Sequence, residues 1–194
     1  MILVPGKCIY LCTPATGSRS TAKVLAEQCG GRWLNGTHHA NLTDMPLLEG
    51  RAEPVITTIR DPYDYVLSRY WYNYKPKEVK AANPIESYIP KFSLENREGE
   101  YGKQFGSMMC MYRDYVDRYF VFEDGLQPIF DAIGCSDVEL PEVGKLTPLQ
   151  WLQWGPRLRV DEISEEAKTL IEKHFPMELE LYRKVKAGEF RKAA

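Results

Sequence analysis

Long hydrophobic runs are absent from this sequence, which has no stretch of about 18 uninterrupted apolar residues of the kind that spans a bilayer. The apolar residues at the N-terminus are broken by Lys7 and have no basic region before them, so we expect no secretory leader. An excess of charge of one sign is also missing, because 25 basic residues stand against 27 acidic ones and give a net charge of −2. We therefore expect neither a nucleic-acid polymer nor a membrane as a partner.

Cysteine and histidine are too few and too scattered for a disulfide framework or a metal site. The five cysteines are odd in number and include no Cys-x-x-Cys pair, so a reducing compartment, the cytoplasm, is expected. Two of the three histidines, His38 and His39, are adjacent, and no metal-ligand spacing is present. The sequence therefore predicts no metal cofactor.

What is present is the patterning of an ordinary globular domain, with 44% hydrophobic and 27% charged residues. The length of 194 residues fits one domain, residues 1–194. Apolar runs that alternate with helical periodicities predict an α/β fold with a largely parallel sheet. The expected strands are 7–12, 32–34 (weak), 55–59 and 119–122. The expected helices are 20–29, 62–74 with Asp61 as its cap, 105–116, 129–133, 164–174 and 177–186.

One long segment has no clear pattern. Residues 75–103 are polar, with three prolines, two glycines and no sustained periodicity. Long connections of this kind often carry functional loops. We predict a lid or substrate-binding segment at residues 75–105.

The loop after the first expected strand has the composition of an anion-binding site. Residues 13–20 read TPATGSRS and lead from a strand into a helix, which places backbone N–H groups and a helix N-terminus around an anion. Gly17 allows close approach of the backbone, and Arg19 adds a positive charge. Hydroxyl donors come from Thr16, Ser18, Ser20 and Thr21. An ordinary strand–loop–helix connection is the alternative interpretation.

Two other phosphate-binding motifs do not fit this loop. It has one glycine and no lysine, whereas a Walker A loop needs GxxxxGK[ST], so an ATPase or a nucleotide kinase is disfavoured. A thiol phosphatase needs one residue fewer between its cysteine and its arginine than the six that separate Cys12 from Arg19.

A second motif lies downstream, where TIRDPYDYVLSRYWY ends an expected strand at Arg60 and places Ser68 eight residues later. With the loop, it resembles sulfotransferases that use 3′-phosphoadenylyl sulfate (PAPS). In that family the 3′-phosphate motif is Arg-[Asn/Asp]-Pro with Ser at this offset, and the 5′-phosphosulfate loop is usually Pro-Lys-[Thr/Ser]-Gly-[Ser/Thr]. The segments His39-Ala40, RYFVFEDGLQPIFDAIG and EEAKTLIEKHFPMELELYRKV follow in the family's order. The resemblance covers most of the chain except residues 75–105.

The resemblance implies a three-layer, P-loop-like α/β fold and transfer of a sulfuryl group from PAPS to a hydroxyl of a sugar, a small metabolite or a peptide tyrosine. PAPS would be the co-substrate and adenosine 3′,5′-bisphosphate (PAP) the product, while the oligomeric state stays open. His39 would be the base that takes the proton of the acceptor hydroxyl, and His38 could exchange roles with it. Arg19 would neutralise charge on the leaving phosphosulfate. The implied nucleotide-binding residues are Thr16, Gly17, Ser18, Arg19, Ser20, Thr21, Arg60, Ser68 and Lys145.

Simpler interpretations remain open at several of these positions. Arg60 could form a salt bridge with Asp64, and Ser68 could be a solvent-facing helical serine. The histidines could be surface residues without a role, and the aromatic residues at 63–74 could be core or could stack on a ring. Ala15 stands where the family has lysine, so a nucleotide-binding module without transfer activity is the alternative function. A P-loop-type nucleotide kinase comes third.

Overall fold

The computed structural model describes residues 1–35, 39, 42–74, 80, 82–97, 112–141 and 156–192. Its centre is a five-stranded sheet with the order β3-β1-β2-β4-β5. The strands are β1 (Ile2–Val4), β2 (Cys8–Leu11), β3 (Arg32–Trp33), β4 (Val55–Ile59) and β5 (Arg118–Val121). The helices are α1 (Ser18–Gln28), α2 (Pro62–Asn73), α4 (Ile85–Arg97), α6 (Gln127–Ala132), α8 (Glu165–His174) and α9 (Pro176–Lys186). Short 3₁₀ turns are η1 (Leu42–Leu48), η3 (Phe122–Asp124) and η4 (Val160–Glu162).

The α/β class is confirmed, but the expectation of a largely parallel sheet is wrong, because the sheet is mixed. β4 runs parallel to both β2 and β5, whereas β1 runs antiparallel to both β2 and β3. The difference comes from residues 2–4, which form a hairpin with β2. The chain reverses where Gly6 has φ 68° and the N–H of Lys7 donates to the carbonyl of Val4 at 3.0 Å. A left-handed glycine permits such a tight turn.

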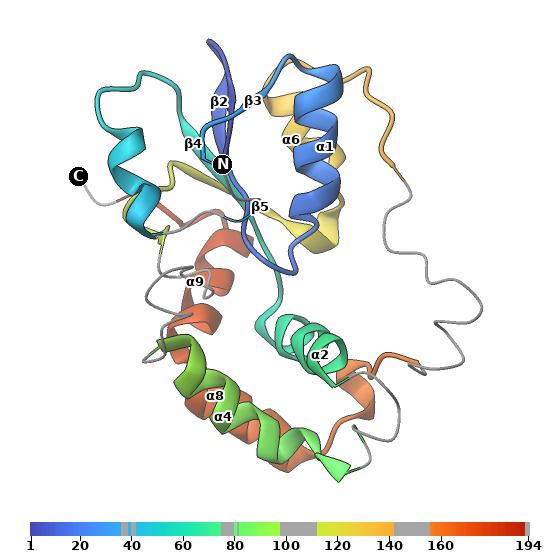
Figure 1. The fold of residues 1–194 in the computed structure, drawn as a ribbon. Coiled ribbons are helices and arrows are strands. Elements are labelled where there is room, and N and C mark those ends of the chain that lie inside the picture. The colour runs from blue at the N-terminus through green and yellow to red at the C-terminus, as the bar shows by residue number, and fades with distance from the viewer. Residues whose placement is uncertain are drawn as a thin grey trace.

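Helices cover both faces of the sheet and form three layers with it (Figure 1). On one face α1 and α6 lie side by side and bury Cys8 and Tyr10 of β2. The next residues of β2, Ile9 and Leu11, enter the core on the other face, as the two-residue period of a strand requires. On that face α9 contacts β5, and α2, α4 and α8 gather below the sheet in Figure 1. In the part of the chain described, no helix is both long and apolar enough to cross a bilayer.

Helix α4 lies within 75–105, where no helix was predicted. It carries Pro90 in its interior and still buries Tyr88, Ile89 and Phe92. The ring of Phe92 stacks on that of Tyr88 at 5.1 Å and packs against Phe175. The lid stays a prediction, and residues 75–79, 81 and 98–105 lie outside the described residues. Of the helix predicted at 105–116, the described part, 112–116, forms turns instead.

The connections that follow β2 and β4 leave a crevice at the carboxyl ends of these two strands. From β2 the chain runs through α1 to β3, on one side, and from β4 it runs through α2 toward β5, on the other side. The parallel strands β2 and β4 therefore send their following helices in opposite directions. In open α/β sheets, ligands bind outside the carboxyl ends of strands at such a switch point.

Candidate functional site

The loop between β2 and α1 holds its shape through its own hydroxyl groups. The hydroxyl of Thr16 is 2.8 Å from that of Thr13 and donates to the Thr13 carbonyl at 2.9 Å. Thr13 in turn donates to the carbonyl of Thr58 in β4 at 3.2 Å. Thr16 and Thr21 are fully buried, and the Thr21 hydroxyl donates to the Gly17 carbonyl. The predicted site residues Thr16 and Thr21 therefore support the loop through hydrogen bonds on its buried side.

Two residues of this loop have left-handed backbone conformations, Ala15 with φ 58° and Gly17 with φ 73°. A Cβ atom on Gly17 would lie 2.8 Å from Cε2 of Phe122 in η3, so a side chain there would require the ring to move. Loops that alternate left- and right-handed residues turn successive N–H groups toward one point and bind anions. Gly17 thus packs closely against Phe122, and its predicted close approach to an anion stays a prediction.

Helix α1 begins in this loop without a side-chain cap. Gly17 is its N-cap, no side chain accepts a hydrogen bond from its first turn, and no acidic residue lies there. Helices α2 and α8, in contrast, are capped by Asp61, which accepts from the Tyr63 N–H, and by Ser164. The first turn of α1 instead carries Arg19, which is exposed. An uncapped N-terminus with an added cation attracts a negative group.

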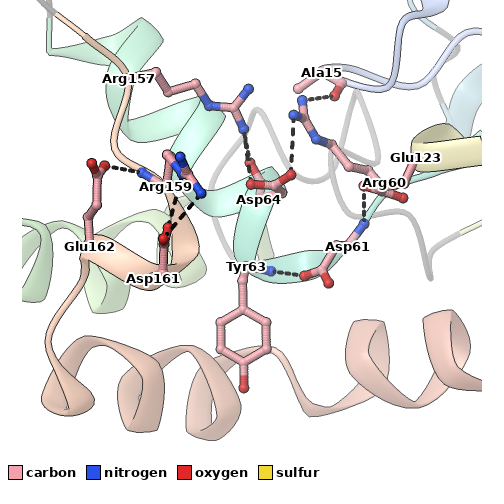
Figure 2. Close-up of polar contacts among 10 residues, drawn as sticks. All are labelled: Ala15, Arg60, Asp61, Tyr63, Asp64, Glu123, Arg157, Arg159, Asp161 and Glu162. Carbon is pink, nitrogen blue, oxygen red and sulfur yellow. Dashed lines mark hydrogen bonds and ion pairs between the residues drawn. The ribbon is translucent and has the colours of Figure 1, made fainter. Parts of the chain in front are cut away.

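Arg60 is tied to the protein itself, as the simpler interpretation anticipated (Figure 2). It follows β4, is 7% exposed, and donates to the Ala15 carbonyl at 3.0 Å. Its guanidinium also pairs with Asp64 at 3.7 Å and lies 4.7 Å from the ring centre of Phe122. Burial lowers the pKa of Arg60, while Asp64 and other nearby carboxylates oppose that shift. In this structure the guanidinium of Arg60 therefore binds the backbone of the loop and does not face the open side of the crevice.

A second guanidinium shares the same carboxylate, which no sequence signal had indicated. Arg157 donates to the backbone carbonyl of Asp64 at 2.7 Å and lies 3.6 Å from its carboxylate (Figure 2). Burial, with the charge of Arg60, lowers the pKa of Arg157 to about 10. Asp64 thus joins the guanidinium groups of Arg60 and Arg157 at the first turn of α2.

Farther along α2, Ser68 and Arg69 face the crevice together with Tyr72, whose side chain is half-exposed. The guanidinium of Arg69 lies 5.9 Å from the ring centre of Tyr72. Its Nε is buried without an acceptor, and Arg69 has no carboxylate partner among the residues that the structure describes. A half-buried guanidinium in this state favours an external anion. Sequence reasoning missed Arg69, and the only signal for Tyr72 was the aromatic run from 63 to 74.

His39 reaches the same crevice from the connection between β3 and η1. Its Nδ1 is 3.4 Å from the backbone carbonyl of Cys12. A carbonyl oxygen only accepts, so a hydrogen bond here requires the proton to be on Nδ1. One ring nitrogen of His39 is thus directed at the backbone of the loop, and its side chain lines the crevice.

These segments, far apart in sequence, line one pocket of about 430 Å³. Its lining consists of Pro14, Ala15, Gly17, Ser18, Arg19, Ser20, His39, Ser68, Arg69 and Tyr72. Six residues predicted from the sequence thus meet, while Arg60, Thr16 and Thr21 lie behind the loop. His38 and Lys145 lie outside the described residues. A larger hollow, about 730 Å³, lies by Val55 at the opposite end of β4, and no predicted site residue lines it.

No protein-family model, curated protein or solved structure matches this chain.

Proposed function

We propose that this chain is a sulfotransferase of three-layer, P-loop-like fold that transfers the sulfuryl group of PAPS to a hydroxyl acceptor. The observation that carries the proposal is the shared pocket of the 14–20 loop, His39 and Ser68. Each of these three segments matches a separate part of the family resemblance. An unrelated set of surface residues has no reason to meet at a switch point of the sheet.

The charges around the pocket suit a ligand with negative groups at two places. One place is the uncapped start of α1 with Arg19, which would hold the 5′-phosphosulfate. The other is Ser68 with Arg69 on α2, which would hold the 3′-phosphate. The exposed ring of Tyr72 lies beside them and offers a face for a base or sugar ring. In this assignment Arg60 fixes the loop.

The proposed reaction needs a base, a stabilised leaving group and little else from the protein. The acceptor oxygen would form a bond to the sulfur while the bond from sulfur to the 5′-phosphate oxygen breaks, and PAP leaves. Nε2 of His39 would take the acceptor's proton. The N–H groups of the α1 first turn and the Arg19 guanidinium would stabilise charge that grows on the leaving phosphate.

Ala15 supports a second candidate, a PAPS- or PAP-binding module without transfer activity. The related loop has lysine where this chain has Ala15, and the Ala15 carbonyl is held by Arg60. The positive charge must then come from Arg19, on the other side of Gly17. Guanidinium and ammonium groups differ in shape and hydration, so this replacement could bind the nucleotide and still catalyse poorly.

Ligand-dependent unfolding temperatures test the nucleotide, and turnover tests the reaction. PAP should raise the midpoint of thermal unfolding more than AMP or ATP at equal concentration, because a ligand that binds the folded state stabilises it by mass action. If ATP stabilises the protein more than PAP does, the sulfotransferase assignment is wrong and a nucleotide kinase is favoured. Transfer of labelled sulfate from PAPS over a panel of hydroxyl acceptors then separates the enzyme from the binding module.

A further inference from the structure

Three cysteines gather at the end of the sheet opposite the pocket, where α1 and α6 end. Cys29 is the C-cap of α1, Cys135 follows α6, and Cys8 begins β2 beneath them. Cys29 and Cys135 both pack against the core cluster that contains Cys8, and Cys135 is close enough to raise the pKa of Cys29. Both side chains are partly exposed, whereas Cys8 is fully buried. An adjacent pair of accessible thiols is the arrangement that thiol–disulfide exchange requires.

A lysine completes this cluster. Lys7, in the turn between β1 and β2, places its Nζ 3.0 Å from the sulfur of Cys135 and 3.2 Å from the carbonyl of Gly134. The hydrogen bond to Cys135 raises the pKa of Lys7, so its ammonium persists. A cation in contact with a sulfur stabilises the negative charge that a nucleophilic thiolate carries.

The backbone around Cys135 is held in place. Gln28, at the end of α1, exchanges two hydrogen bonds with the backbone of Glu139, at 3.1 and 2.9 Å. The Cys135 N–H donates to the Phe130 carbonyl at 2.8 Å, and Gln127 donates to the Ser136 carbonyl. These contacts fix the segment that carries Cys135 against the end of α1 that carries Cys29.

We propose that Cys135 and Cys29 form a thiol–disulfide exchange site for low-molecular-weight disulfides such as oxidised glutathione, with Lys7 as the residue that supports the Cys135 thiolate. In the first step the Cys135 sulfur attacks one sulfur of oxidised glutathione, the S–S bond of glutathione breaks, and one glutathione leaves as a thiolate. In the second step the Cys29 sulfur attacks Cys135 and expels the second glutathione. The two cysteine protons are taken up by the two glutathione thiolates, so the chain loses two hydrogen atoms and the glutathione is reduced.

The order of the two steps follows from the surroundings of each sulfur. Burial raises the pKa of Cys29 to about 12, and the hydrogen bond and charge of Cys135 add to this. Cys29 is nevertheless partly exposed and lies beside Cys135, so it can act as the resolving thiol once Cys135 is bonded to glutathione. Burial also raises the pKa of Cys8 to about 12 and of Cys12 to about 11. Both are also fully buried, whereas Cys29 is partly exposed, so we expect both to stay reduced because a dissolved disulfide cannot reach them.

Peptide mapping after treatment of the reduced full chain with oxidised glutathione tests the proposal. Samples are quenched with acid and alkylated before digestion. We expect wild type to yield a Cys29–Cys135 cross-linked peptide and Cys29→Ser to stop at a glutathione adduct on Cys135. In the Cys29→Ser background, Lys7→Met should slow adduct formation roughly threefold or more, while Lys7→Arg should keep the rate. Lys23→Met, an exposed lysine on α1, is the matched control and should change nothing.

Two results would overturn the proposal. One is a wild-type protein in which Cys29 and Cys135 stay reduced while another cysteine takes up glutathione. The other is an adduct rate on Cys135 that Lys7→Met leaves unchanged, which would remove Lys7 from the site. The first of these results is measured on the wild-type protein, so it does not depend on whether the variants fold. The cluster lies at the opposite end of α1 from Gly17, so neither result depends on the proposed sulfotransferase function.

Discussion

The guanidinium of Arg60 donates a hydrogen bond of 3.0 Å to the backbone carbonyl of Ala15. This contact joins the end of β4 to the loop that follows β2. Ala15 has φ 58°, a left-handed conformation that costs a non-glycine residue about 1–2 kcal/mol. Arg60 therefore holds an unfavourable backbone conformation in the wall of the pocket, and the loop's shape depends on a side chain from another strand.

We expect Arg60→Met to weaken binding of PAP and of AMP to the same extent, by about 2–4 kcal/mol, because the loop loses its buried charged donor. Isothermal titration with both nucleotides gives the comparison. A loss confined to PAP would contradict this role, since it would mean that Arg60 binds the 3′-phosphate directly, as the family resemblance implies.

Arg69→Gln, unlike Arg60→Met, should weaken the binding of PAP selectively. We expect it to weaken PAP binding about tenfold to a hundredfold and to leave AMP binding unchanged, because only PAP has the 3′-phosphate that the guanidinium would bind. Ser68→Ala should act in the same sense by about 1 kcal/mol, as expected for a neutral donor. Arg113→Gln, at an exposed arginine outside the pocket, is the control. Equal losses for both nucleotides in Arg69→Gln would remove Arg69 from the second anion site.

His39→Ala should lower kcat by about 10²–10⁴-fold while the affinity for PAP hardly changes, because a base acts on the acceptor side. The wild-type rate should rise with pH across about 6–7, where imidazole loses its proton and becomes able to accept one. Single-turnover rates with PAPS and titrations with PAP measure the two quantities. His38→Ala should have a much smaller effect, and unchanged turnover in His39→Ala would place the base elsewhere.

Gly17→Ala should destabilise the protein more than Gly30→Ala. Both glycines have left-handed backbones, at φ 73° and 70°. A Cβ at Gly30 would meet nothing within 4 Å, whereas one at Gly17 would lie 2.8 Å from the ring of Phe122. Urea unfolding of the two variants therefore separates the backbone cost, about 1 kcal/mol or more in both, from the steric cost in Gly17→Ala alone. Equal losses would mean that Phe122 moves aside without cost.

Local signals were enough to predict most elements of the fold. The β-branched run at 55–59 is β4, and the Asp61-Pro62 pair begins α2, with Asp61 accepting from the Tyr63 N–H at 2.8 Å. Two elements had no such signal. β1 has three residues and is defined by its pairing with β2, and α4 contains Pro90, which disfavours a helical prediction.

The pocket was only partly predictable for a similar reason. Gly17 and Ser68 follow from the motifs, and both line the pocket. Sequence spacing does not show that Thr16 turns inward to Thr13, or that Arg60 is engaged by Asp64. The exposure of Arg69 to the pocket depends on how α2 is rotated against the sheet, which is set by contacts between distant segments.

The pairing of β2 with β4 has a consequence for the kinetics of folding. β1 contacts both β2 and α1 within the first 28 residues, whereas the Thr57 hydroxyl of β4 donates to the Leu11 carbonyl across 46 positions. The loop and α2 face each other only after this long-range pairing has formed, and such pairings are slow. A nucleotide that needs both can bind only after the slow step. It should lower the unfolding rate and leave the refolding rate nearly unchanged, which stopped-flow measurements with and without PAP would resolve.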